Sequence, residues 1–174
     1  DKVWHELAFG LESLGFDNAS IKRRVAEMAN FFDIQGWFRK SVTELSGGQK
    51  QLLNLASVMV MQPKVLILDE PTAQLDPIAA SEFMRTLYRI NRELGTTVII
   101  SEHRLEELFP MADRVIVMDA GRIAYCGAPE EVGIRLAEDN NPMFYGLPAV
   151  MKIYARAGAG GKCPMTIRDG RLWL

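Results

Sequence analysis

The chain has 174 residues, of which 48% are apolar and 24% charged, proportions that suit a folded domain and argue against a disordered segment. Its 20 basic and 22 acidic residues give a net charge of −2, and no long basic run indicates a nucleic-acid surface. The most apolar stretch, residues 52–68, is interrupted by a Gln-Pro-Lys sequence, so it cannot cross a bilayer as one helix. The two cysteines, Cys126 and Cys163, have no metal-ligand spacing.

The spacing of apolar residues predicts that residues 1–62 contain three helices and no strand. The first helix would span residues 3–14. The second would begin at a cap, either Asn18 or Ser20, and the third would run over residues 46–61. The first third of the chain is therefore expected to form a purely helical region.

From residue 63 onward, short apolar runs alternate with helices, which is typical of an α/β fold with a mostly parallel sheet. The expected elements are buried strands at 65–68 and 96–101, helices at 77–94 and 105–111, and a strand pair at 114–118 and 123–126. Beyond these, the sequence predicts a helix at 130–138, an irregular tail over 140–162 and a small hairpin at 166–174.

The segment Leu45-Ser46-Gly47-Gly48-Gln49 opens the third expected helix. It reads as a capping box, in which Ser46 and Gln49 satisfy each other's backbone donors. Capping does not require two consecutive glycines in the first turn, where each costs about 0.5–1 kcal/mol relative to alanine. The glycines would let an anion approach the N–H groups at the positive end of the helix. Taken alone, the segment leaves both readings open.

Two carboxylates, Asp69 and Glu70, follow the first apolar strand directly. Ligands of open α/β sheets bind at the carboxyl ends of strands. At that place Asp69 could hold Mg²⁺ through water, and Glu70 could orient or deprotonate an attacking water. The structural alternative is that Asp69 only caps the turn into Pro71.

Two further polar residues stand at the ends of expected elements. Asp76 precedes Pro77 and is a good N-cap for the next helix, which alone would explain its presence. His103 follows the second expected strand. A lone histidine is more often structural than catalytic, but beside an acidic strand end it could donate a hydrogen bond to a γ-phosphate.

The order and spacing of these segments, all within residues 45–103, resemble the ABC ATPase family, and the resemblance covers residues 1–132. It implies a partial RecA-like P-loop NTPase core, preceded by the helical subdomain of that family. It also implies that ATP and Mg²⁺ are the ligands and that Asp69 holds the metal. The implied roles are the signature motif for Ser46, Gly47, Gly48 and Gln49, the catalytic glutamate for Glu70, the D-loop aspartate for Asp76 and the switch histidine for His103.

The family resemblance further implies an ATPase subunit that energises transport from the cytoplasmic face of the membrane. Two such domains pair head to tail around ATP and act on transmembrane subunits. A narrower resemblance, carried by residues 3–10, 101–107 and 142–174, is to energy-coupling-factor (ECF) and cobalt-type importer ATPases, including the first half of tandem ATPases. The expected parts are a helical subdomain at 1–62, a core segment at 63–132 and a tail or linker at 133–174.

One feature of the family is missing, because no G-x-x-x-x-G-K-[ST] motif occurs in the sequence. The glycine-rich run at 158–163 lacks the spacing, and the Q-loop glutamine and the adenine-stacking aromatic are absent as well. The P-loop holds the β and γ phosphates. We therefore expect a fragment that binds ATP weakly by itself, hydrolyses it hardly at all and self-associates through exposed strand edges.

Two other classes of function remain open at this stage. One is a non-transport ABC ATPase in DNA repair or translation, although neither a sustained coiled-coil pattern nor a basic arm is present. The other is a catalytically idle dimerisation module, against which the intact Glu70 and His103 argue. The transported substrate is not indicated, since vitamins and transition-metal ions both fit the ECF resemblance.

Overall fold

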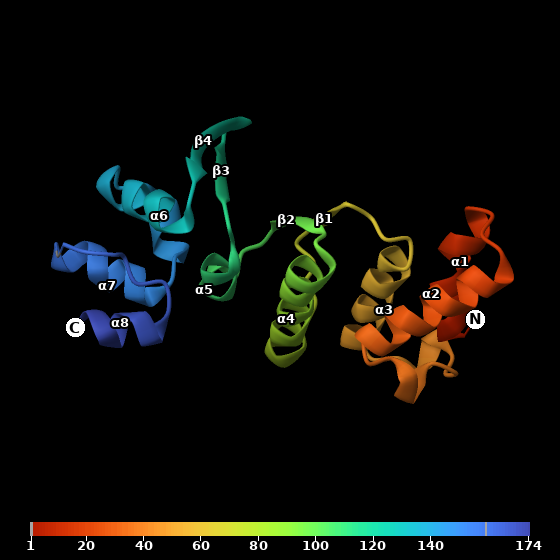
Figure 1. The fold of residues 1–174 in the computed structure, drawn as a ribbon. Coiled ribbons are helices and arrows are strands. Elements are labelled where there is room, and N and C mark those ends of the chain that lie inside the picture. Colours follow the sequence, from red (N-terminus) through yellow and green to blue (C-terminus); the bar gives the residue numbers. More distant parts are fainter. Residues whose placement is uncertain (1, 159) are drawn as a thin grey trace. The chain divides into compact units, whose positions relative to one another are not determined.

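A computed structural model describes residues 2–158 and 160–174, and the chain divides into two compact units, Asp1–Ser101 and Glu102–Leu174 (Figure 1). The first unit contains the helices α1 (Val3–Ser13), α2 (Asn18–Phe31), α3 (Gly47–Met59) and α4 (Pro77–Leu94), the 3₁₀ turns η1 (Gln35–Trp37) and η2 (Val42–Glu44), and the strands β1 (Val65–Asp69) and β2 (Thr97–Ser101). The second unit contains the helices α5 (Leu105–Leu108), α6 (Pro129–Glu138), α7 (Ala149–Ala157) and α8 (Ile167–Trp173), the 3₁₀ turns η3 (Phe109–Met111) and η4 (Pro142–Gly146), and the strands β3 (Val115–Asp119) and β4 (Arg122–Gly127).

The helical region predicted for the first third of the chain is confirmed. Helix α1 packs against α2 and α3, and the side chains of Val3, Leu7 and Leu11 are fully buried between them. Within residues 2–62 the only strand-like feature that the structure describes is a single bridge between Lys2 and Ser41. No helix in the described part of the chain is both long and apolar enough to span a bilayer.

The predicted cap of α2 is wrong. The N-cap is Asp17, whose carboxylate accepts hydrogen bonds from the N–H groups of Ala19 and Ser20 at 2.9 and 3.0 Å. Asn18 and Ser20 already belong to the helix. Asp17 has the extended backbone of an N-cap, and from there its short side chain reaches the N–H groups two and three residues ahead.

Strands β1 and β2 form a parallel pair, as the sequence predicts, and their register places Asp69 opposite Ser101. The prediction that both strands are buried is wrong for one face. Leu66 is buried, but Val65, Ile67 and Ile99 are 51%, 73% and 51% exposed. Successive side chains of a strand point to opposite faces, and α4 packs against β2 on one face only. The other face of the pair therefore presents apolar side chains to solvent.

Helix α4 begins and ends where the sequence predicts. The Asp76 carboxylate accepts hydrogen bonds from the N–H groups of Ile78 and Ala79, both at 3.0 Å, and Pro77 occupies the first turn. Gly95 ends the helix with a φ of 68°, a left-handed conformation that glycine adopts without steric cost.

In the second unit, β3 and β4 form the expected antiparallel pair, and α6 matches the predicted helix. The predicted hairpin at 166–174 is wrong, because residues 167–173 form α8. Thr166 and Asp169 close a capping box there, and a Cβ on Gly170 would lie 3.1 Å from Val150 of α7. The predicted irregular tail is also partly wrong, since it contains η4 and α7.

The core of the second unit gathers residues from its strands and from the tail. Its buried members are Phe109, Val117, Val132, Leu136, Leu147, Met151, Tyr154 and Cys163. The rings of Tyr154 in α7 and Trp173 in α8 pack edge to face, with their centroids 5.3 Å apart, and this contact stabilises the packing of α8 against α7. The tail is therefore ordered by burial of apolar side chains, among them Leu147, Met151 and Tyr154 at helical spacing.

Candidate functional site

Residues 46–49, which are expected to be the signature motif, form the N-cap and first turn of α3. The N–H of Gln49 donates to the Ser46 hydroxyl at 3.2 Å, and the N–H of Ser46 donates to the Gln49 side-chain carbonyl at 3.0 Å. The capping box is therefore confirmed. Ser46 and Gly47 are exposed, so this helix N-terminus is accessible to an anion as well.

The two glycines of this turn have different surroundings. A Cβ on Gly47 would meet no atom within 4 Å, whereas a Cβ on Gly48 would lie 3.1 Å from the Cβ of Ala79 in α4. Gly48 thus permits a close approach between the first turns of α3 and α4. Gly47 has no such packing role. The structure therefore places the signature turn beside the turn that Asp76 caps.

Asp69 and Glu70 lie at the carboxyl end of β1, next to Ser101 at the carboxyl end of β2. The Ser101 hydroxyl donates to Oδ1 of Asp69. The N–H of Glu70 donates to the Ser101 carbonyl at 3.1 Å and to its hydroxyl at 3.2 Å. Both acidic side chains are exposed at this edge.

The backbone of Glu70 has a φ of 44°, in the left-handed region. This conformation costs a residue other than glycine roughly 1–2 kcal/mol. Residues held in this way persist only where surrounding contacts determine them, and they cluster at functional sites. Here the two hydrogen bonds from the Glu70 N–H to Ser101 supply such contacts.

A further hydrogen bond joins the signature helix to the loop that follows the acidic pair. The side-chain amide of Gln51 in α3 donates to the Pro71 carbonyl at 3.1 Å, and Pro71 and Thr72 are buried beside it. Sequence reasoning assigned no role to Gln51 or to Ser101. Their positions along the sequence could have indicated both residues. Gln51 is four residues after Gly47, on the same face of α3, and Ser101 is the last residue of the strand beside Asp69.

The structure collects the signature residues, Asp69, Glu70 and Asp76 in the first unit, whereas His103 belongs to the second unit. The N–H of His103 donates to the Glu102 carboxylate at 3.2 Å, and its side chain is exposed. Its proposed contact with a phosphate stays a prediction.

The Asp69 carboxylate at the end of β1 is a suitable ligand for Mg²⁺. Mg²⁺ in nucleotide sites keeps several water ligands and binds through one or two carboxylates together with phosphate oxygens. Asp69 offers an exposed carboxylate oriented by one hydroxyl, which suits that mode. In residues 2–158 and 160–174, no three His, Cys, Asp or Glu side chains gather into an all-protein metal site.

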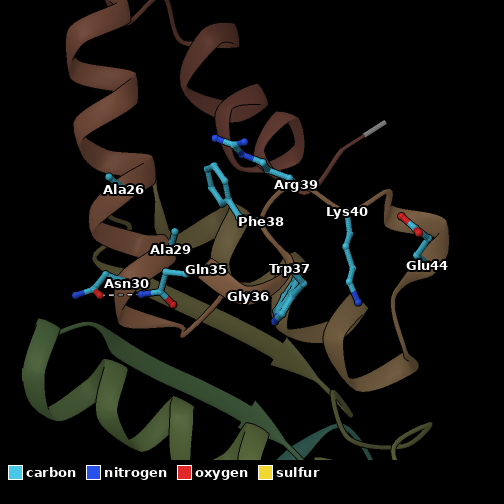
Figure 2. A pocket seen from close by; sticks show the side chains of 10 residues that line it. All are labelled: Ala26, Ala29, Asn30, Gln35, Gly36, Trp37, Phe38, Arg39, Lys40 and Glu44. Atoms are coloured by element: carbon cyan, nitrogen blue, oxygen red, sulfur yellow. Dashed lines mark hydrogen bonds between the residues drawn. The ribbon is translucent and has the colours of Figure 1, made fainter.

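A separate groove of about 770 Å³ opens in the helical region (Figure 2). Its lining residues are Ala26, Ala29, Asn30, Gln35, Gly36, Trp37, Phe38, Arg39, Lys40 and Glu44. Asn30 and Gln35 are joined by a hydrogen bond of 2.8 Å. The segment 37–40 contributes two aromatic side chains followed by two basic ones. Neither residues 46–49 nor the acidic pair Asp69 and Glu70 line this groove.

Known proteins match the chain in sequence. The model of the ABC transporter family matches residues 3–73. A Bacillus anthracis protein with a provisional name as an ABC transporter ATP-binding protein is 48% identical over 174 residues, which is 100% of this chain and 31% of that protein. A Clostridium tetani protein with a similar name is 40% identical over 166 residues, covering 95% of this chain and 37% of its own length. The chain thus spans about a third of the length of these relatives.

Solved structures match the fold. The structure of cbiO1 from Clostridium perfringens, described as part of the ABC transporter complex cbiONQ, is 37% identical with a TM-score of 0.70, over 83% of this chain and 59% of that chain. MJ1267, an ATP-binding cassette of an ABC transporter, is 25% identical with a TM-score of 0.69, over 83% of this chain and 62% of its own.

The α/β fold and the motif turns together define a segment of an ATP-binding cassette, with the fold of P-loop NTPases. The chain belongs to the ABC transporter ATP-binding family.

Proposed function

We propose that the chain is part of the ATP-binding and ATP-hydrolysing subunit of an ABC importer of the ECF type, at the cytoplasmic face of the membrane. The observation that carries this proposal is that one unit contains both the glycine-containing N-terminus of α3 and the acidic residues at the carboxyl end of β1. The ECF assignment is supported by the likeness to cbiO1, part of the complex cbiONQ.

The residues of this chain would serve two different nucleotides. Ser46, Gly47, Gly48 and Gln49 would offer the start of α3 to an ATP held by a second ABC ATPase domain, in a head-to-tail dimer. Asp76, capping the neighbouring helix, would lie at the junction between the two sites. A P-loop outside these 174 residues would hold the nucleotide that this chain's acidic residues serve.

At that nucleotide, Asp69 would bind the metal through water, and bound Mg²⁺ would neutralise charge on the phosphates. Glu70 would orient or deprotonate the attacking water, since its exposed carboxylate stands directly after the strand. His103 would donate a hydrogen bond to the γ-phosphate and sense its loss. Closure and reopening of the dimer would then move transmembrane subunits that contact the helical region, residues 1–62.

The proposal is tested in the complete ATPase that combines this chain with its P-loop segment. Glu70→Gln should lower the rate of ATP hydrolysis by about 100-fold or more while ATP-dependent dimerisation persists, because only the base is lost. The matched control is Glu93→Gln, which changes an exposed carboxylate of α4 that pairs with Arg89 and should leave the rate unchanged.

A hydrolysis rate that Glu70→Gln leaves intact would refute the proposed role of this residue. Dimerisation by ATP without measurable turnover in the unmodified enzyme would instead favour the idle dimerisation module. Reconstitution with transmembrane subunits separates transport from non-transport functions, since only a transporter would couple hydrolysis to substrate uptake.

The chain by itself should turn over ATP hardly at all and should self-associate. The apolar face formed by Val65, Ile67 and Ile99 supports this proposal, because exposed apolar strands pair readily with one another. Light scattering should detect oligomers that Ile67→Thr weakens, since threonine keeps the strand propensity and removes apolar area. A clean monomer at high concentration would contradict the proposal.

A further inference from the structure

Ser101 makes two different contacts with the acidic pair from the neighbouring strand. Its hydroxyl donates to Oδ1 of Asp69, and the same hydroxyl accepts from the Glu70 N–H at 3.2 Å. A hydroxyl has one proton to donate and two lone pairs. Ser101 therefore uses its only donor on one acidic residue and an acceptor on the backbone of the next.

The parallel register makes these contacts possible. Asp69 and Ser101 are direct partners at the carboxyl ends of β1 and β2, so their side chains leave the same edge of the pair on the same face. The Glu70 N–H also donates to the Ser101 carbonyl at 3.1 Å. Ser101 thus holds Glu70 at the point where its backbone turns into the left-handed region, with φ of 44°.

We propose that Ser101 is a positioning residue for ATP hydrolysis: its hydroxyl orients the Asp69 carboxylate toward the metal and holds the Glu70 backbone so that the base faces the attacking water. This inference rests on the proposed function. Hydrogen-bonding partners of metal-binding carboxylates fix the orientation of those ligands, and removing such a partner typically lowers metal affinity or activity by about 10–100-fold.

The test compares Ser101→Thr with Ser101→Val in the complete ATPase. Threonine and valine have nearly the same shape, and both suit a β-strand, but only threonine keeps the hydroxyl. The valine variant should lose about 10–100-fold in kcat and in Mn²⁺ affinity, whereas the threonine variant should stay close to the unmodified enzyme. The KM for ATP should change little, because the P-loop holds the phosphates.

Two readouts do not depend on turnover. Mn²⁺ affinity is measured by electron paramagnetic resonance with a saturating non-hydrolysable ATP analogue, and the hydrogen exchange of the Glu70 amide is measured in the chain itself. Both should change in the valine variant and stay near the original values in the threonine variant. Thr97→Val removes a hydroxyl from the other end of β2 and is the control for folding.

The outcomes separate the two proposals. If Glu70→Gln abolishes hydrolysis but the valine and threonine variants have equal Mn²⁺ affinity and equal kcat, the positioning role of Ser101 is refuted alone. If Glu70→Gln leaves hydrolysis intact, the proposed function itself fails. Should the valine variant unfold, Ser101→Ala removes the hydroxyl without adding volume and decides the question by the same measurements.

Discussion

Replacement of Gly47 by alanine separates capping from phosphate contact in the signature turn. The added Cβ would meet no atom of the described chain within 4 Å, so the folded state accommodates it without strain. Gly47 is also the first residue of α3, where alanine is a better helix former than glycine. The substitution should therefore leave the fold intact or stabilise it.

The magnitudes follow from these surroundings. The gain in helix propensity is at most about 0.5–1 kcal/mol, which for a unit of this size raises the melting temperature by roughly 2–8 °C. In the proposed site, the same methyl group would keep a phosphate from the exposed N–H groups of the turn. Losing one hydrogen bond to a charged group costs about 1.5–3 kcal/mol, or roughly ten- to hundredfold in binding.

Two assays measure these opposite effects. Thermal unfolding of the chain, followed by circular dichroism, should show Gly47→Ala at least as stable as the original sequence. ATP-dependent dimerisation and hydrolysis in the complete ATPase should fall by about ten- to hundredfold. Gly48→Ala is the matched comparison, because its Cβ would lie 3.1 Å from Ala79 and should remove the gain in stability.

Unchanged dimerisation and hydrolysis in Gly47→Ala would refute the phosphate contact and leave the segment as a capping box only. A loss of stability greater than about 1 kcal/mol would show instead that the space around Gly47 is not open, since a surface glycine-to-alanine change in a helix does not otherwise destabilise.

Further predictions concern stability and reactivity. Gly133→Ala would place a Cβ 2.2 Å from the Met151 Cε, which is buried in the core and must move; it should lower the free energy of unfolding in urea, because overpacking costs about 1–3 kcal/mol and outweighs the gain of about 0.5–1 kcal/mol from replacing a helical glycine. Burial raises the pKa of the Cys163 thiol to about 11, so Ellman's reagent at pH 8 should label Cys126 first. Because the folded chain keeps a Cys163 proton that the unfolded chain loses above about pH 9, stability should fall between pH 9 and pH 11. Asp76→Ala removes two N-cap hydrogen bonds of α4 and should cost about 1 kcal/mol in thermal unfolding.

Each of these has a control within the chain. Gly160→Ala adds a Cβ with no atom within 4 Å and should be neutral; equal losses in both glycine variants would contradict the packing argument. Cys163→Ala should flatten the stability profile above pH 9, and an unchanged slope would assign it to other groups. Asp76→Ser keeps an N-cap acceptor and should retain most of the stability.

Elements whose causes lie within a few residues can be predicted from local sequence alone. The capping box of Ser46 and Gln49, the cap of α4 at Asp76 and the end of that helix at Gly95 are all set by short-range hydrogen bonds and by φ preferences. The candidate residues were also recognisable from order and spacing, because motif residues follow strand ends and helix starts that can be read from apolar periodicity.

Contacts between residues far apart in the sequence depend on how the elements pack in three dimensions. The Ser101 hydroxyl reaches Asp69 across 32 positions of sequence, and Gly48 meets Ala79 across two helices. The helix at residues 167–173 packs on α7, where a Cβ on Gly170 would lie 3.1 Å from Val150. An apolar strand pattern likewise cannot say which face is covered, since Ile67 and Leu66 are equally apolar and only packing distinguishes them. Such contacts depend on how elements pack in space, and that information is not carried by spacing along one chain.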